Sequence, residues 1–174
     1  MNRKLSETIL TLLAIGLVTI RPALGDAFVE LTSTNSPRFL PTATLLTNGQ
    51  VLVAGGGGDP IFQIVATTEM YDPPTLAWSS VGSMSTPRVA HRAVLLPSGK
   101  VLVAGGSNND TNLASAELYD PFTKTWTVTG FLCVPRFNHQ MALLTTGKVL
   151  VAGGFDDAGE PIHSAELFDP VSGT

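Results

Sequence analysis

Three short, almost wholly apolar runs recur along the chain, each with the sequence Val-Leu-Val-Ala-Gly-Gly. They occupy residues 51–56, 101–106 and 149–154, so one unit repeats at intervals of 50 and 48 residues. An apolar run of this length that ends in turn residues is typical of a strand buried on both faces. Repetition at this period predicts successive propeller blades, each covered by its neighbours.

A second apolar stretch precedes each of these runs and is separated from it by a short polar turn. The turns contain Asn48-Gly49, Ser98-Gly99 and Thr146-Gly147. Glycine at the second turn position accepts a positive φ, which a tight hairpin requires. The two stretches are therefore expected to be paired antiparallel strands. Each repeat begins at a Pro-Arg pair: Pro37-Arg38, Pro87-Arg88 and Pro135-Arg136.

Two further strands are expected later in each repeat. The third strand ends in an Asp-Pro turn, in the segments 68–73, 116–121 and 165–170, and the fourth contains Trp78 or Trp126. The pattern predicts an all-β protein of three four-stranded antiparallel blades, which form a partial or open propeller. No helix is expected after residues 1–25. The repeats span about 37–86, 87–134 and 135–174, and the last is incomplete because it stops before its fourth strand.

These marks resemble the kelch repeat, with its double glycine, tyrosine and tryptophan, over residues 28–174. The matching residues are Gly55, Gly56, Tyr71 and Trp78 in the first copy, Gly105, Gly106, Tyr119 and Trp126 in the second, and Gly153, Gly154 and Phe168 in the third. Within this family the chain resembles secreted kelch proteins of the bacterial type, related to the central propeller of galactose oxidase. The resemblance implies a binding module, although secreted copper enzymes share the fold.

A short segment precedes the first complete repeat and has the spacing of a fourth strand. Phe28 precedes Pro37 by nine residues, as Trp78 precedes Pro87, so residues 28–36 are expected to form an isolated fourth strand. Three blades fall below the usual four to eight, which would leave apolar blade faces exposed. Two alternatives follow: the chain is the first part of a longer protein, or two copies exchange terminal strands to form a six-bladed homodimer.

The first 25 residues have the pattern of a secretory signal peptide. Arg3 and Lys4 are followed by an apolar stretch over residues 9–20 and by small residues at Ala23 and Gly25. That stretch is too short to span a bilayer, so an uncleaved anchor is the weaker alternative and no stable membrane span is expected after cleavage. The mature domain, residues 26–174, is therefore predicted to be secreted or to lie in the periplasm or cell envelope. Cys133 is the single cysteine, which excludes an internal disulfide.

Charge narrows the class of partner. The chain carries 14 acidic and 10 basic residues, a net charge of −4, and removal of the leader makes it more acidic. No cluster of Lys and Arg interrupts this balance, so nucleic acid is not an expected partner.

Several side chains recur at one phase. Arg38, Arg88 and Arg136 share a position, and so do Glu69, Glu117 and Glu166; these predict a structural ion pair in each blade rather than a ring of ligand-binding charge. His91 and His139 are also equivalent. No third histidine or cysteine stands at a matching phase, so a metal site is not expected there.

No catalytic constellation is found. Galactose oxidase uses two tyrosines, one linked to a cysteine, and two histidines, whereas Tyr71 and Tyr119 here are the kelch tyrosines of their blades and Cys133 lies between blades. Residues 55–58 are glycines without a following Lys-Ser or Lys-Thr, so they do not predict a phosphate site. Neither catalytic residues nor a cofactor are expected.

The repeats differ most in the loops after the double glycines, residues 57–67, 107–115 and 155–164. Two of them carry hard oxygen ligands, which could hold calcium weakly or simply form solvated turns: Asn108, Asn109, Asp110, Asp156, Asp157 and Glu160. The sequence favours an exported, non-enzymatic recognition module that presents these loops to an unidentified protein or glycan. The alternative is a fragment of a galactose-oxidase-like secreted copper oxidase whose active residues lie outside this sequence.

Overall fold

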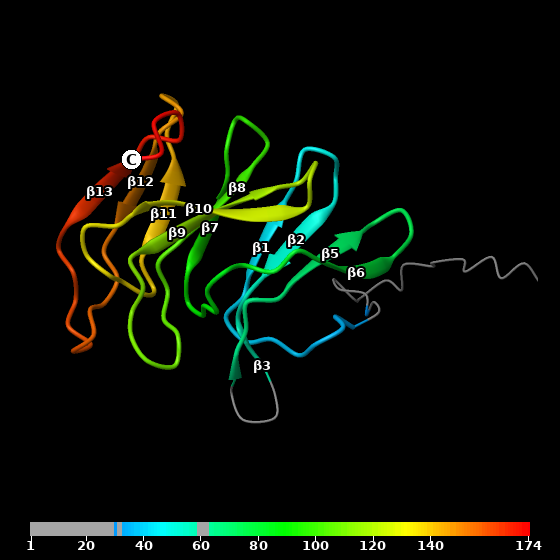
Figure 1. Ribbon diagram of the computed structural model, residues 1–174, viewed down its shortest axis with the longest axis horizontal. Coiled ribbons are helices and arrows are strands. Elements are labelled where there is room, and N and C mark those ends of the chain that lie inside the picture. The colour runs from blue at the N-terminus through cyan, green and yellow to red at the C-terminus, as the bar shows by residue number, and fades with distance from the viewer. Residues whose placement is uncertain (1–29, 31–32, 59–62) are drawn as a thin grey trace, which may run out of the picture. The chain divides into compact units, whose positions relative to one another are not determined.

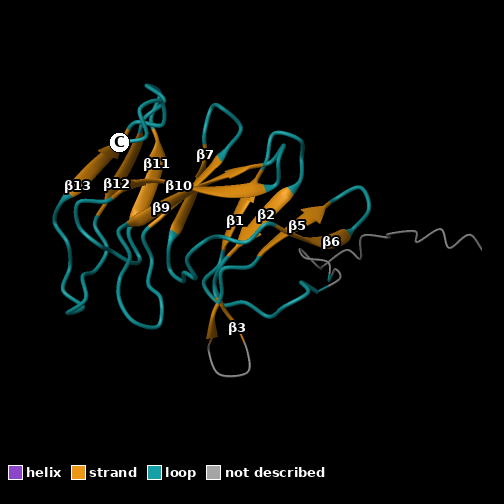
Figure 2. Ribbon diagram, in the orientation of Figure 1, coloured by secondary structure: helices purple, strands orange, loops and turns teal. Residues whose placement is uncertain are grey.

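The computed structural model describes residue 30, residues 33–58 and residues 63–174. The expected signal peptide and residues 28, 29, 31 and 32 of the expected isolated strand over residues 28–36 lie outside these ranges. Residue 30 and residues 33–36, which are described, form no strand. The strands belong to one compact unit, Leu31–Thr174. Its described part contains no helix, and therefore none that could cross a membrane (Figure 2).

The first two repeats each form a four-stranded antiparallel sheet. The first has the order β1-β2-β5-β6 and the second the order β7-β8-β9-β10, as the repeat pattern predicts. The first sheet consists of β1 (Thr42–Leu45), β2 (Val51–Ala54), β5 (Thr68–Asp72) and β6 (Ala77–Val81). The second consists of β7 (Arg92–Leu95), β8 (Val101–Ala104), β9 (Ser115–Asp120) and β10 (Thr125–Phe131).

The third repeat forms a sheet of three strands within the described residues, in the order β11-β12-β13. These are β11 (Gln140–Leu143), β12 (Val149–Ala152) and β13 (Ala165–Phe168). Among the described residues this sheet therefore has no fourth strand, as the spacing of the repeats predicts. In Figure 1, β7 of the second sheet lies beside both β1 and β11, so the first strands of the three blades are neighbours.

The hairpin turns are confirmed in detail. Gly49, Gly99 and Gly147 have φ of 84°, 81° and 82°, which only glycine adopts without strain. The register follows from these turns, since Leu45 pairs with Val51, Leu95 with Val101 and Leu143 with Val149. The expected all-β, kelch-type open propeller is therefore the observed fold.

A small additional hairpin departs from the expected loop over residues 57–67. Gly57–Gly58 form β3, which pairs with β4, Gln63–Ile64. Gly57 also bridges Phe39, and a Cβ on Gly57 would overlap the Phe39 ring. Glycine is depleted in strands, so sequence propensity predicts a loop here, whereas close packing against Phe39 selects the extended pairing.

The core lies between the sheets rather than within any one of them. Leu52 and Met70 of the first sheet pack against Val101 and Tyr119 of the second. Leu102 and Ala104 of the second sheet pack in the same way against Val149 of the third. This face-to-face burial explains why the Val-Leu-Val-Ala strands are apolar at every position, since alternate residues enter two different cores.

Candidate functional site

A buried ion pair stands at the same place in every blade. The Nη2 atom of the arginine lies 2.7 Å from Glu69 in the Arg38 pair, 2.8 Å from Glu117 in the Arg88 pair and 2.7 Å from Glu166 in the Arg136 pair. Both members of the Arg88 pair are fully buried. The predicted structural ion pairs are therefore confirmed, and these charges are neutralised within the blades.

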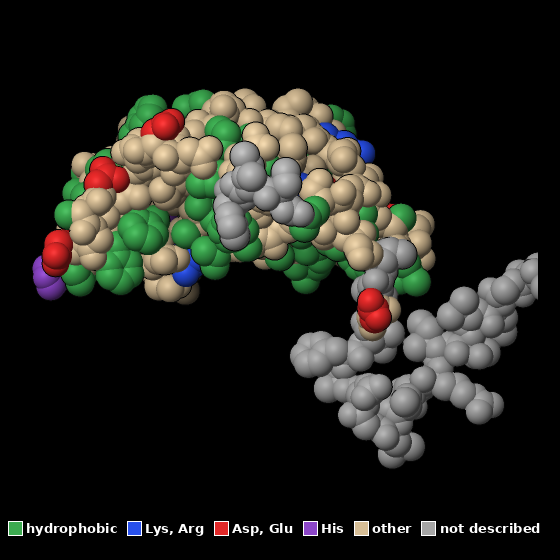
Figure 3. Space-filling model, turned by 90° about the horizontal axis from the view of Figure 1, so that it is seen from below, with side chains coloured by type: hydrophobic (Ala, Val, Ile, Leu, Met, Phe, Trp, Pro, Cys, Tyr) green, Lys and Arg blue, Asp and Glu red, His purple; other side chains and the backbone are tan. Residues whose placement is uncertain are grey.

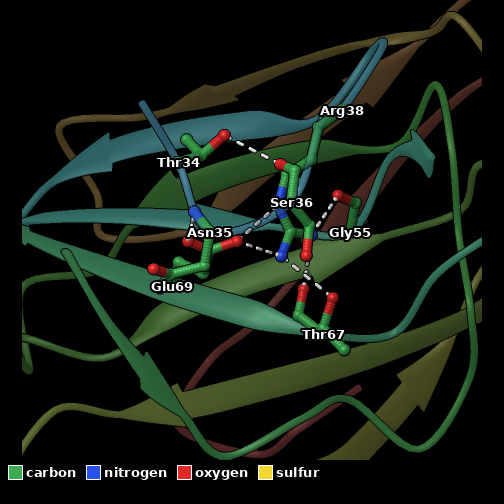
Figure 4. A network of polar contacts seen from close by, with 7 residues as sticks. All are labelled: Thr34, Asn35, Ser36, Arg38, Gly55, Thr67 and Glu69. Atoms are coloured by element: carbon green, nitrogen blue, oxygen red, sulfur yellow. Dashed lines mark hydrogen bonds and ion pairs between the residues drawn. The ribbon is translucent and has the colours of Figure 1, made fainter. Parts of the chain in front are cut away.

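Each arginine also bridges the two ends of the loop that follows the double glycine. Figure 4 shows the first case, in which Nη1 of Arg38 donates to the carbonyls of Gly55 and Thr67, both at 2.9 Å. Arg88 donates likewise to the carbonyls of Gly105 and Ser115. In each blade Nη1 thus holds a loop stem closed while Nη2 of the same guanidinium contacts the glutamate.

The glutamates bind the chain segment that leads into the same blade. The backbone N–H of Asn35 donates to Glu69 at 2.8 Å, and that of Ser85 donates to Glu117 at 2.7 Å. In the third blade, Cys133 and Val134 donate to Glu166. Burial raises the pKa of Glu166, but these two N–H groups and Arg136 outweigh burial and leave its pKa below the ordinary value. The carboxylate remains charged and structural.

The double glycines form the seam between consecutive blades. Gly55 and Gly56 have φ of 62° and 98°, and Gly56 N–H donates to the carbonyl of Arg88 in the next blade at 2.9 Å. Gly106 donates in the same way to Arg136. A Cβ on Gly55 would lie 2.6 Å from the Arg88 oxygen, so a side chain would separate the blades. The kelch glycines are therefore packing residues.

The two equivalent histidines fill the same seams. His91 and His139 are completely buried, and the position of a Cβ on Gly55 lies 2.9 Å from Cε1 of His91. Nε2 of His91 lies 3.0 Å from Oγ1 of Thr42 in the preceding blade. Burial, and then the positive charge of the neighbouring arginine, lower the pKa of His91 to about 3 and that of His139 to about 4. Both imidazoles are neutral near pH 7.

The kelch aromatic residues pack in pairs within their blades. The rings of Tyr71 and Trp78 have centroids 5.0 Å apart, and those of Tyr119 and Trp126 are 5.1 Å apart. Nε1 of Trp126 donates to the carbonyl of Gly82 in the preceding blade at 2.8 Å. Burial, and then the charge of Asp120, raise the pKa of Tyr119. Cys133 is a free, exposed cysteine in the segment between β10 and β11.

The loops of the second and third blades are joined by the side chain of Asp157, which the sequence pattern indicated only as a weak calcium ligand. Asp157, from the β12–β13 loop, accepts the backbone N–H of Asn112 in the β8–β9 loop at 2.8 Å. The Thr111 hydroxyl contacts the same carboxylate. The two loops therefore form one continuous surface across the seam between their blades.

The other proposed calcium ligands are largely engaged in local turns. Oδ1 of Asn108 accepts the N–H groups of Asp110 and Thr111, both at 2.9 Å. Oδ1 of Asp156 accepts those of Ala158 and Glu160, also both at 2.9 Å. Among the described residues, no three His, Cys, Asp or Glu side chains are grouped so that they could share a metal ion. Weak calcium binding stays a prediction.

Between these two loops lies an open polar hollow of about 420 Å³. In Figure 3, acidic side chains are distributed over the end of the molecule where the two loops lie. The hollow combines carboxylates, amides and one aromatic ring, and its lining includes Asn109, Asp110, Asn112, Phe137, Asp156 and Asp157. Such a set can donate and accept hydrogen bonds while a ring covers an apolar face of a ligand.

Sequence reasoning missed two seam features. The first is a pair of glycines that pack against the following blade. A Cβ on Gly82 would overlap the carbonyl of Lys124, and a Cβ on Gly130 would lie 2.5 Å from the carbonyl of Gly173. The sequence does mark these glycines, because each stands four residues after the tryptophan of its blade. Leu40, Ala90 and Asn138 share a positive φ of about 50°, with φ of 49°, 54° and 52°. Their side chains differ, so no residue type marked that position.

Comparison with known proteins gives one family. The model of the Kelch motif matches residues 38–85 and 88–129, together just over half of the chain. A search of curated proteins gives no match. Kelch repeats generally mediate protein interactions, and domains built from them are typically non-enzymatic.

Proposed function

The chain belongs to the kelch-repeat family, and we propose that it is an exported, non-enzymatic recognition module that presents its variable loops to a protein or glycan partner. The observation that carries this proposal is the polar hollow between the β8–β9 and β12–β13 loops. It is the place where two loops of different sequence, from successive blades, meet in one concave surface.

The repeated residues stabilise the blades and the variable residues lie at the surface, which supports a binding role for the loops. The charged and aromatic residues that recur in phase are used inside the blades, as the Arg88–Glu117 pair and the Tyr119–Trp126 contact illustrate. Asn109 and Asp110 do not recur and lie exposed at the rim of the hollow. Variable polar residues on a rigid framework are the usual arrangement of a recognition surface.

The chemistry of the hollow favours hydroxyl-bearing or basic partners. Asp110, Asp156 and Asp157 give it an acidic character, which disfavours phosphate and nucleic acid. Carboxylates and amides bind sugar hydroxyls by accepting and donating hydrogen bonds, and Phe137 offers a ring for the apolar face of a sugar. A basic peptide would satisfy the same carboxylates. Export is supported by the leader pattern of residues 1–25.

A glycan array, combined with affinity capture of proteins from the secreted fraction, tests the proposal. The informative variants are Asn109→Ala and Asp110→Asn at the hollow. Asp72→Asn is the charge-matched control, because Asp72 ends β5 at the opposite end of its blade. Binding that is lost with the hollow variants and kept with Asp72→Asn is expected. Binding that is unaffected by the hollow variants, or enzymatic turnover of a bound glycan, would overturn the proposal.

A further inference from the structure

The third sheet exposes an apolar face that its counterparts bury. We call the face of a sheet directed toward the next sheet along the chain its trailing face, and the opposite one its leading face. On the trailing face the second and third strands contribute the register pairs Leu52–Met70, Leu102–Leu118 and Leu150–Leu167. Leu52 and Leu102 are each 1% exposed, whereas Leu150 is 36% and Leu167 is 51% exposed.

The chain itself shows what covers such a face. Leu52 and Met70 are buried by Val101 and Tyr119, which lie on the leading face of the second sheet. The trailing face of the second sheet is buried by Val149 and Phe168 of the third. The same interface is therefore built twice, each time from a trailing face and the leading face that follows it.

The glycine seam shows a matching vacancy at the third sheet. A Cβ on Gly105 would lie 2.6 Å from the carbonyl of Arg136, whereas among the described residues a Cβ on Gly153 would meet only the carbonyl of Ile162, at 4.0 Å. Gly153 nevertheless has the same backbone conformation, with φ of 66° against 62° for Gly105. The seam of the third sheet is thus shaped to receive the carbonyl of a Pro-Arg pair.

The complementary leading face is present on the first sheet. Pro37-Arg38 repeats the Pro-Arg pair that occupies the other two seams. Leu45 on this face is 64% exposed, while Tyr71 takes the place that the fully buried Tyr119 has in the second sheet. The unit therefore carries both halves of one interface on its first and third sheets.

From these observations we propose that the trailing face of the third sheet binds the leading face of the first sheet of a second copy of this chain. The Arg38 carbonyl of one copy accepts the Gly154 N–H of the other, as Arg88 accepts that of Gly56. Leu150 and Leu167 pack against Leu45 and Tyr71. Two such contacts related by a twofold axis close a ring of six sheets, within the usual range for propellers.

Sedimentation of the purified chain over a range of concentrations tests the proposal. A mass of two copies is expected, and Leu167→Asp and Leu45→Asp should each weaken association by more than about tenfold, because each places a charge on the buried apolar surface. Phe122→Asp is the matched control, since Phe122 is 95% exposed in the β9–β10 turn, and it should leave the dimer intact.

Mixing the two variants separates this arrangement from any other. A Leu167→Asp copy keeps an intact leading face and a Leu45→Asp copy keeps an intact trailing face, so the mixture should form one good contact and associate more tightly than either variant alone. A wild-type chain that is monomeric at all concentrations would overturn the proposal. Loss of association with Leu167→Asp but not with Leu45→Asp would also overturn it, because the third sheet would then pair with itself.

Discussion

The second and third sheets contain the same Val-Leu-Val-Ala strand but bury it differently. All four residues of β8 are buried, whereas in β12 Leu150 is exposed and Ala152 is half-buried. The second sheet lies between two others, and the third has a neighbour on its leading face only, within the described residues. The comparison teaches that an apolar residue in a repeat acquires its burial from the next repeat, so identical segments contribute unequally to stability.

Removal of a buried arginine should give the largest effect. Arg88→Met leaves the buried Glu117 without its ion-pair partner, and should lower the free energy of unfolding by about 3–5 kcal/mol. Arg136→Met should cost less, because the Glu166 side chain is 16% exposed and keeps contact with solvent. Urea unfolding measures both.

The control for the arginine pair is Lys100→Met. Lys100 lies 3.2 Å from Asp120 at the surface, and its loss should cost less than about 1 kcal/mol. Equal destabilisation by Arg88→Met and Lys100→Met would contradict the claim that burial sets the cost.

Equivalent leucines in the two sheets should respond differently to truncation. Leu102→Ala opens a cavity between the second and third sheets and should cost about 2–4 kcal/mol. Leu150→Ala should cost about 1 kcal/mol or less while the chain is monomeric, because its side chain already meets solvent. Urea midpoints at low protein concentration check the difference. If the two values agree, the exposed face is covered in solution.

Acid should weaken both seams through their histidines. An unfolded imidazole binds a proton below about pH 6.5, whereas His91, with a pKa of about 3, and His139, with a pKa of about 4, stay neutral in the folded chain. The unfolded state therefore binds more protons, so stability should fall as the pH falls below 6.5. The slope should be about 1.4 kcal/mol per pH unit for each histidine.

Urea unfolding between pH 6 and pH 5 isolates this effect, because Glu166, whose pKa is also lowered, adds its loss only at lower pH. His91→Gln should reduce the slope by half, and His163→Gln, which replaces an exposed histidine, should leave it unchanged. Below about pH 4, His91 is the one of these two histidines that still adds to the loss, and the lowered pKa of Glu166 adds to it as well. A slope that His91→Gln leaves intact would refute a neutral buried imidazole.

Calcium should have the smallest effect. The oxygens of Asn108 and Asp156 already accept backbone N–H groups, so binding at the two loops should be weak and about the same in the Asp156→Ala, Asp157→Ala double variant. Isothermal titration calorimetry measures it. Micromolar affinity that the double variant abolishes would show that the third blade carries a calcium site.

The sequence predicts the repeating framework because its signals are local and occur three times. The turn glycines, the Asp-Pro ends of β5, β9 and the third repeat, and the Arg–Glu pairs each follow from residues at fixed spacing. The β3–β4 hairpin was missed because its pairing depends on the distant Phe39 ring. The contact of Asp157 with Asn112 was also missed, since it joins variable loops 45 residues apart, where no repeated phase relates one loop to the other.

The arginine that closes each loop stem has a consequence for engineering. Arg38, Arg88 and Arg136 lie outside the loops that they close, and each bridges the two ends of a loop of different length: Gly55 to Thr67, Gly105 to Ser115, and Gly153 to Ser164. The hydrogen bonds from Nη1 of each arginine therefore use only backbone carbonyls at the two ends of the loop, whatever the length of the loop. A foreign peptide grafted between residues 107 and 114 would be anchored by the same two hydrogen bonds, which makes this blade a scaffold for selecting new binding specificities.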